Sequence, residues 1–365
     1  MTTLNKIITI DGSLGEGGGQ ILRTSLALSA ILGMPLKVIN IRAKRENPGL
    51  QHQHITAVKV VSALSNAKTE GLYLGSKELL FYPNKLSGGN FEFDVGTAGS
   101  VMLVLQAILP ILPFLETSTK IVLKGGTDVP GAPTFDYFKN VTLELLKRIG
   151  IDMKANIKRR GYYPKGGGIV DIFIESPKGR LKNIELLKRG ELKKIKIFSV
   201  AHKLPSHIAK RQALSAQSFL EERLQGILYE TEIEDDEKNH ELASFSPGTS
   251  ISIIAEAKES ILGGDSLGKK GKPAEKVGED AAKVLIEDIS TQMALDRFMS
   301  DMIIPFLALA KGKSKVGGSR LTLHAITNIL VIEKILNIKA KVLGKQEEPF
   351  IVEVDGIDPF SLYVK

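Results

Sequence analysis

The chain has 365 residues, of which 43% are hydrophobic and 25% charged, an ordinary composition for a globular protein large enough for two or three domains. It contains no cysteine, which excludes a disulfide framework, a thiolate zinc site and a cysteine nucleophile. The formal net charge of +8 favours a polyanionic partner such as nucleic acid, although basicity for solubility alone explains it about equally well.

The first segment, at about residues 1–88, alternates strand and helix patterns. The strand "KIITIDG" leads through a glycine turn into the apolar helix "QILRTSLALSAIL". A strand "LKVINIR", a helix around "HITAVKVVSALS" and the strands "KTEGLYLG" and "ELLFYP" follow. Residues 89–180 repeat this order, with "FEFDVG" as the first strand, "VMLVLQAILPIL" as the first helix and "GIVDIFIE" as the last strand.

A third segment, at 181–186 and 290–365, follows the same plan after an interruption. It predicts a helix over 291–310, a strand at "RLTL", a second helix beginning at His324, and the strands "IKAKVLG" and "PFIVEVDG". Each of the three units therefore reads β-α-β-α-β-β. A sheet with helices on one face is an α+β arrangement, which is the fold class that we predict.

The interruption at 187–289 is itself of domain size. Its pattern reads strand, helix, strand, strand, helix, from "KIKIFSVAH" to "AEKVGEDAAKVLIEDI". We therefore predict a large domain of residues 1–186 plus 290–365, and a smaller inserted α/β domain of residues 187–289.

The densest glycine cluster is "GSLGEGGGQILR", residues 12–23, directly before a helix. Exposed backbone amides at a helix N-terminus favour an anion. Glu16 would repel a phosphate unless Mg²⁺ or Mn²⁺ bridged the two, and Arg23 could reach the same anion. A tight turn that needs several glycines explains the cluster equally well.

The loop "IRAKRENPGLQHQH", residues 41–54, gathers Arg42, Arg45, His52 and His54. Arginine forks suit phosphate oxygens. The two histidines could ligate a metal, but no third ligand is evident nearby. A solvated loop without a ligand is the remaining interpretation.

His324 stands between "RLTL" and an apolar helix. A core or helix-capping histidine is the commoner role for such a residue. The chain lacks a P-loop and the KxDG-type motif of lysine nucleotidyltransferases. A neutral imidazole can attack phosphorus directly, and a helix N-terminus would lower its pKa further. His324 is therefore a candidate nucleophile.

Several stretches together resemble the RNA 3′-terminal phosphate cyclase family over nearly the whole chain. They are "DGSLGEGGGQILR", "IRAKRENPGLQHQHITAVK", "GTAGSVMLVLQAILP", "GGTDVPGAPTFDYF", "GYYPKGGG" and "LTLHAITN". The resemblance implies three related units in a pseudo-threefold arrangement, akin to the enolpyruvyl transferases, with one inserted α/β domain. It is weakest over the insertion.

The resemblance also implies a three-step reaction. A histidine attacks the α-phosphorus of ATP and releases pyrophosphate. The AMP passes to the RNA 3′-phosphate, giving an RNA(3′)pp(5′)A end. The adjacent 2′-hydroxyl then expels AMP and leaves a 2′,3′-cyclic phosphate. ATP, Mg²⁺ or Mn²⁺ and an RNA with a 3′-phosphate end are therefore the expected ligands.

The same resemblance implies residue roles. His324 matches the nucleophile and Glu16 the residue for the divalent metal. The residues that match nucleotide contacts are Arg23, Gln106, Pro133, Phe298, Asp301 and Met302. The residues that match contacts to the RNA end are Arg42, Arg45, Gln53 and His54. Phe298 stands where we expect tyrosine, so a ring is kept and a hydroxyl is lost. Met302 stands where we expect glutamine, and the loss of that amide puts the strictness of ATP over GTP in doubt.

Two alternatives stay open at this point. One is a non-catalytic RNA-binding relative that acts in ribosome biogenesis, and the other is a transferase of enolpyruvyl type. The presence of both His324 and Glu16 favours the enzyme.

The sequence has no apolar run that could span a membrane and no signal-peptide pattern, so we expect a cytoplasmic protein without a membrane partner. The oligomeric state stays open, with a homodimer as one option.

Overall fold

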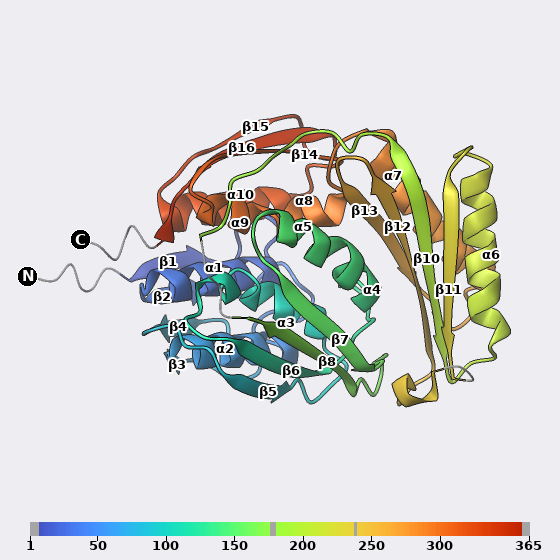
Figure 1. Cartoon of the computed structure of the whole chain (residues 1–365). Coiled ribbons are helices and arrows are strands. Elements are labelled where there is room, and N and C mark those ends of the chain that lie inside the picture. Colours follow the sequence, from blue (N-terminus) through green and yellow to red (C-terminus); the bar gives the residue numbers. More distant parts are fainter. Residues whose placement is uncertain (1–6, 176–179, 237–238, 360–365) are drawn as a thin grey trace, which may run out of the picture.

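The computed structural model describes residues 7–175, 180–236 and 239–359. It contains four-stranded sheets with helices packed against them, which confirms the predicted α+β class (Figure 1). Within these residues, no helix combines the length and the apolarity that a membrane crossing requires.

The first sheet has the strand order β1-β2-β4-β3. The β1–β2 pair is parallel and the other two pairs are antiparallel. The elements, in chain order, are β1 (Ile8–Asp11), α1 (Gly19–Leu32), β2 (Leu36–Ile39), α2 (His52–Ser65), β3 (Lys68–Glu70) and β4 (Leu79–Tyr82). Helix α1 is buried along almost its whole length, because its residues are nearly all apolar or small.

The second sheet has the corresponding order β5-β6-β8-β7, again with one parallel pair followed by antiparallel pairs. Its strands are β5 (Asn90–Asp94), β6 (Thr119–Gly125), β7 (Met153–Arg159) and β8 (Gly168–Ile174). Its helices are α3 (Val101–Ile108), η1 (Leu112–Phe114), α4 (Phe135–Tyr137), the π-helical η2 (Phe138–Thr142) and α5 (Leu143–Arg148).

The third sheet has the order β9-β14-β16-β15, with β9 parallel to β14. Its strands are β9 (Glu185–Leu186), β14 (Gly312–Gly318), β15 (Ala340–Leu343) and β16 (Phe350–Gly356). Its helices are α8 (Arg297–Met302), α9 (Ile304–Leu309) and α10 (Leu323–Leu336). Strand β9 lies before the insertion, and every other element of this sheet lies after it.

Two predictions in this third unit are wrong. The helix predicted over 291–310 begins only at Arg297, because the Asp296 side chain accepts the backbone N–H groups of Phe298 and Met299 and so caps α8. It is also divided at Ile303, just before a proline. Of the strand predicted at 320–323, the part up to Thr322 is a loop and Leu323 begins α10. The strand of this unit is β14, seven residues that precede this loop, rich in glycine and lysine and therefore weak in β-propensity.

The inserted segment forms its own sheet, in the order β11-β10-β12-β13. Its elements are β10 (Leu192–His202), α6 (His207–Glu221), β11 (Leu228–Asp235), η3 (His240–Leu242), β12 (Gly248–Ala257), β13 (Ile261–Leu267) and α7 (Ala274–Ser290). Strand β13 is absent from the predicted pattern because two glycines interrupt it. Gly263 packs against the Tyr137 ring and Gly264 against the α7 backbone, where a side chain would collide.

Two groups of buried apolar side chains fill the molecule. The larger one joins α1, α3, α9 and α10 to the first three sheets. The smaller one lies between the sheet of the insertion and α6 and α7, and includes Ile195, Ile253 and Leu285. The insertion thus has a core of its own.

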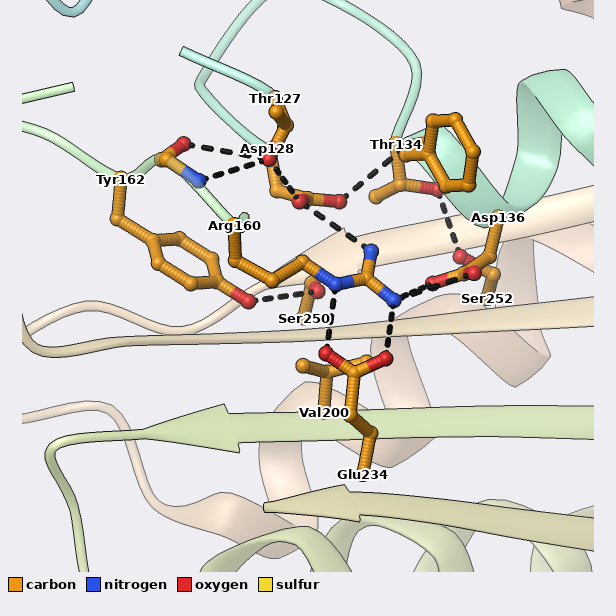
Figure 2. Close-up of polar contacts among 12 residues, drawn as sticks. Thr127, Asp128, Thr134, Asp136, Arg160, Tyr162, Val200, Glu234, Ser250 and Ser252 are labelled. Atoms are coloured by element: carbon orange, nitrogen blue, oxygen red, sulfur yellow. Dashed lines mark hydrogen bonds and ion pairs between the residues drawn. The ribbon is translucent and has the colours of Figure 1, made fainter. Parts of the chain in front are cut away.

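A buried arginine connects the insertion to the rest of the protein (Figure 2). Arg160, directly after β7, contacts Asp128 and Asp136 at 3.4 and 3.0 Å, and Glu234 of β11 at 2.7 Å. Burial lowers the pKa of Arg160, but the three carboxylates outweigh that effect and raise it well above its ordinary value. Hydrogen bonds between the Thr134 and Ser252 hydroxyls and between the Tyr162 and Ser250 hydroxyls cross the same boundary.

Candidate active site

The first turns of three helices, α1, α2 and α10, meet at the glycine loop that precedes α1. A side chain at Gly19 would collide with the His54 and Arg23 side chains, and one at Gly15 would collide with Thr327 of α10. Gly15 and Gly17 both have positive φ, which only glycine adopts at little cost. The loop therefore needs its glycines both for its turns and for this close approach.

Glu16 lies buried at the centre of this meeting point. Its backbone N–H donates to Thr327 Oγ1 at 2.9 Å, and its carboxylate accepts the Gln20 N–H at 3.3 Å and pairs with Arg45. Its Oε1 atom lies 3.8 Å from His324 Nδ1. The acid of the glycine loop and the candidate nucleophile, far apart in sequence, are thus neighbours.

His324 is neither a core residue nor a cap. It is the second residue of α10, and Thr322 caps that helix by accepting the Ala325 N–H at 3.1 Å. Its side chain is 46% exposed. Partial burial lowers the pKa of His324, Glu16 opposes this, and the positive charges of Arg23 and Arg45 lower it again. The ring is therefore neutral at physiological pH.

A cavity of about 840 Å³ opens beside His324. Its lining brings together all of the residues predicted to contact a nucleotide, namely Arg23, Gln106, Pro133, Phe298, Asp301 and Met302. Part of the lining comes from the insertion and includes Asp265, Lys269 and Lys272. A volume of this size accommodates a nucleotide.

Among the residues that the structure describes, two buried polar atoms in this lining have no hydrogen-bond partner, Arg23 Nε and Gln106 Oε1. Arg23 donates through its Nη2 to Gln20 Oε1, at 2.8 Å. Burial lowers the pKa of Arg23 to about 10, and the negative charge of Glu16 offsets only part of the effect. A buried cation with open donors is costly unless an anion binds to it.

The other side of the cavity carries the aromatic and acidic residues. The Phe298 ring meets the Tyr137 ring edge to face, with centroids 5.8 Å apart. Asp301 accepts a 2.5 Å hydrogen bond from the Thr322 hydroxyl. Burial raises the pKa of Asp301 to about 8, so this carboxyl is largely protonated at neutral pH and can itself donate.

The four residues predicted to bind the RNA end lie outside this cavity lining, around the start of α2. His54 is buried, its Nδ1 accepts the Gln51 N–H at 3.2 Å, and its Nε2 faces Gly19. Burial, with Arg23 and Arg42, lowers the pKa of His54 to about 3, so it stays neutral. Its proton is then on Nε2, directed toward the glycine loop.

The other three members of this group have partners already. Arg42 has positive φ and donates to the Asn47 and Gly49 carbonyls, and burial lowers its pKa. Arg45 pairs with Glu16. Gln53 accepts the Ser100 N–H at 2.9 Å and so joins α2 to the start of α3, a structural contact that leaves only its amide N–H groups for a ligand.

The donor set fits a divalent metal in one mode only. Within the described ranges, no cluster of three or more His, Asp or Glu side chains is arranged to hold a metal ion. Mg²⁺ is commonly bound by one or two carboxylates with substrate phosphates and water. Glu16 fits as that carboxylate.

A polar network between α1 and α10 was not predicted. Gln20 Nε2 donates to Thr24 Oγ1 and Asn328 Oδ1, both at 3.1 Å, and Asn328 Nδ2 donates to the Asp301 carbonyl at 2.7 Å. Thr24 and Asn328 are polar residues within otherwise apolar helices, which is the one sequence signal for them. Lys269 and Lys272 belong to the short basic cluster "GKKGK", which gave no indication of its position.

The family model described as RNA 3′-terminal phosphate cyclase matches residues 14–342. The chain belongs to that family. Proteins named RNA 3′-terminal phosphate cyclase are similar along almost their whole length: 48% identity with that of Hyperthermus butylicus (96% of this chain, 98% of the relative) and 47% with that of Ignicoccus hospitalis (96% and 99%). The predicted family is therefore confirmed.

A comparison with solved structures adds little. An EPSP synthase from Acinetobacter baumannii aligns over 97% of this chain and 65% of its own, with 10% identity and a TM-score of 0.24. A score this low supports no conclusion about the fold.

Proposed function

We propose that the protein converts RNA 3′-phosphate ends to 2′,3′-cyclic phosphates at the expense of ATP, through a histidine–AMP adduct on His324. The observation that carries this proposal is the position of a neutral, half-exposed histidine between a buried carboxylate and a cavity whose lining has an unpaired donor, Arg23 Nε, and an unpaired acceptor, Gln106 Oε1, among the described residues. Membership of the cyclase family supports the overall reaction.

In the first step, a ring nitrogen of His324 forms a bond to the α-phosphorus while the bond to pyrophosphate breaks. The proximity of Glu16 to Nδ1 favours a proton on that nitrogen, which leaves the lone pair on Nε2 for the attack. Arg23, the buried guanidinium without an ion-pair partner, would hold the α-phosphate and its developing charge.

The second and third steps concern the RNA end. An oxygen of the RNA 3′-phosphate attacks the same phosphorus and frees His324. The 2′-hydroxyl then attacks the RNA phosphorus and AMP leaves. The vicinal hydroxyl is already held beside the phosphorus, so the closure has the advantage of an intramolecular reaction. Arg42, Arg45, Gln53 and His54 would bind this end, with His54 donating from Nε2.

The remaining cavity residues would select the nucleotide. Pro133 and Phe298 would flank the base, and Gln106 would use its unpaired amide oxygen. Asp301, protonated at neutral pH, could donate to a base nitrogen. Met302 offers no such hydrogen bond. Glu16 would hold Mg²⁺ or Mn²⁺, which when bound neutralises phosphate charge.

We propose two features of the architecture as well. The matching strand orders of the first three sheets support three repeated units in a pseudo-threefold arrangement, as in enolpyruvyl transferases. The separate core of residues 187–289 supports a distinct inserted domain on a catalytic domain of 1–186 plus 290–365. The retained His324 and Glu16 disfavour a non-catalytic role in ribosome biogenesis, and the family disfavours enolpyruvyl transfer.

The test is labelling with ATP that is radioactive at the α-phosphate, in the presence of Mg²⁺ or Mn²⁺. The wild-type protein should acquire acid-labile, base-stable label, and His324→Ala should acquire none. His240→Ala, which removes an exposed histidine of the insertion, is the matched control and should label normally. A wild-type protein that takes no label with either metal, with or without RNA, would contradict the proposal.

A further inference from the structure

The loop "GYYPKGGG", residues 161–168, has no role in the proposed reaction. It joins β7 to β8, and its tip at Tyr163 is 74% exposed. Phe245, from the segment before β12, lies against Gly167 and is 45% exposed. Two large aromatic side chains on one exposed surface indicate a binding partner, since burying them from water would otherwise be favourable.

Arg159 and Lys203 contact Phe245, and the exposed Tyr163 and Lys165 lie on the adjoining turn, where the Lys165 N–H donates to Ser246 Oγ at 3.1 Å; we call these five residues the aromatic–basic patch. The Arg159 guanidinium lies 4.0 Å from the centre of the Phe245 ring, and its Nε donates to the Gly167 carbonyl at 2.7 Å. The Lys203 Nζ donates to the Phe245 carbonyl at 3.3 Å. Within the described residues, none of the three cations forms an ion pair.

This absence of ion pairs distinguishes the patch from its surroundings. The nearby carboxylates Asp128, Asp136 and Glu234 are engaged by Arg160, which is itself buried (Figure 2). The Asp236 carboxylate pairs with His202 at 2.6 Å. The exposed charge of the patch is thus positive, and it complements an anionic partner.

The patch is continuous with the proposed site for the RNA end. Gly166 packs so closely against Thr97 and Ala98 that a side chain there would collide with them. The next residue, Gly99, contacts Gln53, and the Ser100 N–H donates to Gln53 Oε1. His54 follows directly. A chain of contacts therefore leads from the α2 start to the exposed loop tip.

We infer that the aromatic–basic patch binds the RNA strand upstream of its 3′-terminal nucleotide. Unstacked bases would pack on Tyr163 and Phe245, and the three cations would contact phosphates. Exposed aromatic rings interspersed with basic residues are how proteins hold single-stranded RNA without reading its sequence. This inference rests on the proposed function, because it assumes that the 3′-phosphate is bound near His54.

The exposed face of α6 in the insertion is the competing location for RNA. Its Arg211 is already engaged by both carboxylate oxygens of Glu275, at 2.7 and 2.9 Å. Leu214 is its large exposed apolar side chain, and its ring, Phe219, is only partly exposed and lies 3.6 Å from the Arg223 guanidinium. Lys210 on this helix therefore provides a matched control for Lys165.

The experiment measures binding of 3′-phosphorylated RNA by fluorescence anisotropy, with a dinucleotide and with an oligonucleotide of about ten nucleotides, within the usual span of single-strand sites. Tyr163→Ala should weaken binding of the oligonucleotide about tenfold and leave the dinucleotide unchanged. Tyr163→Phe should retain wild-type affinity. Lys165→Ala should reduce the salt dependence of oligonucleotide binding, and Lys210→Ala should not.

Labelling of His324 by ATP is measured on each variant, because it needs no RNA. Normal labelling with a length-dependent loss of RNA binding supports the inference. Tyr163→Ala with unchanged oligonucleotide affinity, or with equal loss for both RNAs, overturns it. An equal effect of Lys210→Ala also overturns it, and so does a patch that binds a protein partner and no RNA. Loss of labelling in the wild type would instead be a failure of the proposed function.

Discussion

Two buried arginines, Arg160 and Arg23, lie in opposite electrostatic environments. Arg160 has three carboxylates around it, from both sides of the boundary with the insertion, and its pKa is raised well above the ordinary value. Arg23 has one hydrogen bond to Gln20 and an unpartnered Nε, and burial lowers its pKa to about 10. Within the described residues, the Arg160 guanidinium has partners for its charge, whereas the Arg23 guanidinium keeps an unpaired donor.

The difference distinguishes a buried charge with a structural role from a buried charge that binds a ligand. A buried charge that has its counter-ions in the chain stabilises one arrangement of elements, here that of β11 against the β6–α4 loop. A buried charge without them raises the free energy of the empty protein and lowers that of the complex with an anion. Arg23, a buried charge with an unpaired hydrogen-bond donor, is therefore stronger evidence for a ligand site than Arg160.

The largest effect is expected when Arg160 is removed. Arg160→Ala leaves Asp128 and Asp136 without their cation and Glu234 with only His202 beside it, so the free energy of unfolding should fall by about 3–5 kcal/mol. Denaturant unfolding measures this. Arg159→Ala, at the neighbouring half-buried position, should stay within about 1 kcal/mol of the wild type. Equal losses in the two variants would mean that the Arg160 cluster does not hold the insertion in place.

Removal of Arg23 should have the opposite outcome. Arg23→Met eliminates an uncompensated buried charge, so the free energy of unfolding should stay unchanged or rise. The rate of His324 labelling should fall about a hundredfold, equivalent to ~3 kcal/mol of transition-state stabilisation. Single-turnover labelling measures the rate. If the variant labels normally but unfolds more easily, Arg23 is a structural residue and the contrast with Arg160 disappears.

A smaller effect is expected from pH. Burial raises the pKa of Glu234, but Arg160 and His202 outweigh it and lower the pKa to about 2, from an ordinary 4.5. A lowered folded-state pKa contributes stability that is present above 4.5 and is lost as the pH falls toward 2. The Glu234→Gln variant should therefore be less stable by ~1–3 kcal/mol at neutral pH, and its stability should change less than that of the wild type as the pH is lowered. Thermal unfolding at a series of pH values gives the comparison; parallel curves for the two proteins would argue against it.

The sequence predicts local features well where a short motif carries the geometry. The glycine loop, the first turn of α10 and the loop of Arg42 all lie where their patterns indicate, because turns and helix starts depend on a few adjacent residues. Strand β14 and strand β13 were missed for the same reason. Each is rich in glycine or lysine, and each is held as a strand by its neighbours in the sheet.

The assembly of the site depends on contacts that no local pattern reveals. His324 lies beside Glu16, and Asp301 accepts a hydrogen bond from Thr322, the cap of α10, because α1, α8 and α10 pack together. The contribution of Lys269 and Asp265 to the cavity follows from the docking of the insertion. Such relations need the tertiary structure, because they join residues from different sheets.

The chain enters and leaves the insertion at one place. Lys188 pairs with Met293 in a β-bridge, and backbone hydrogen bonds join Arg189 to Gln292 and Ala294 to Leu187. A module attached through such a narrow, two-stranded stalk can be lengthened, shortened or exchanged in evolution without disturbing the sheet that it interrupts. Its freedom to diverge ends where it packs on the rest of the chain: at Glu234 of β11, at Ser250 and Ser252 of β12, and at β13, which lines the cavity beside His324.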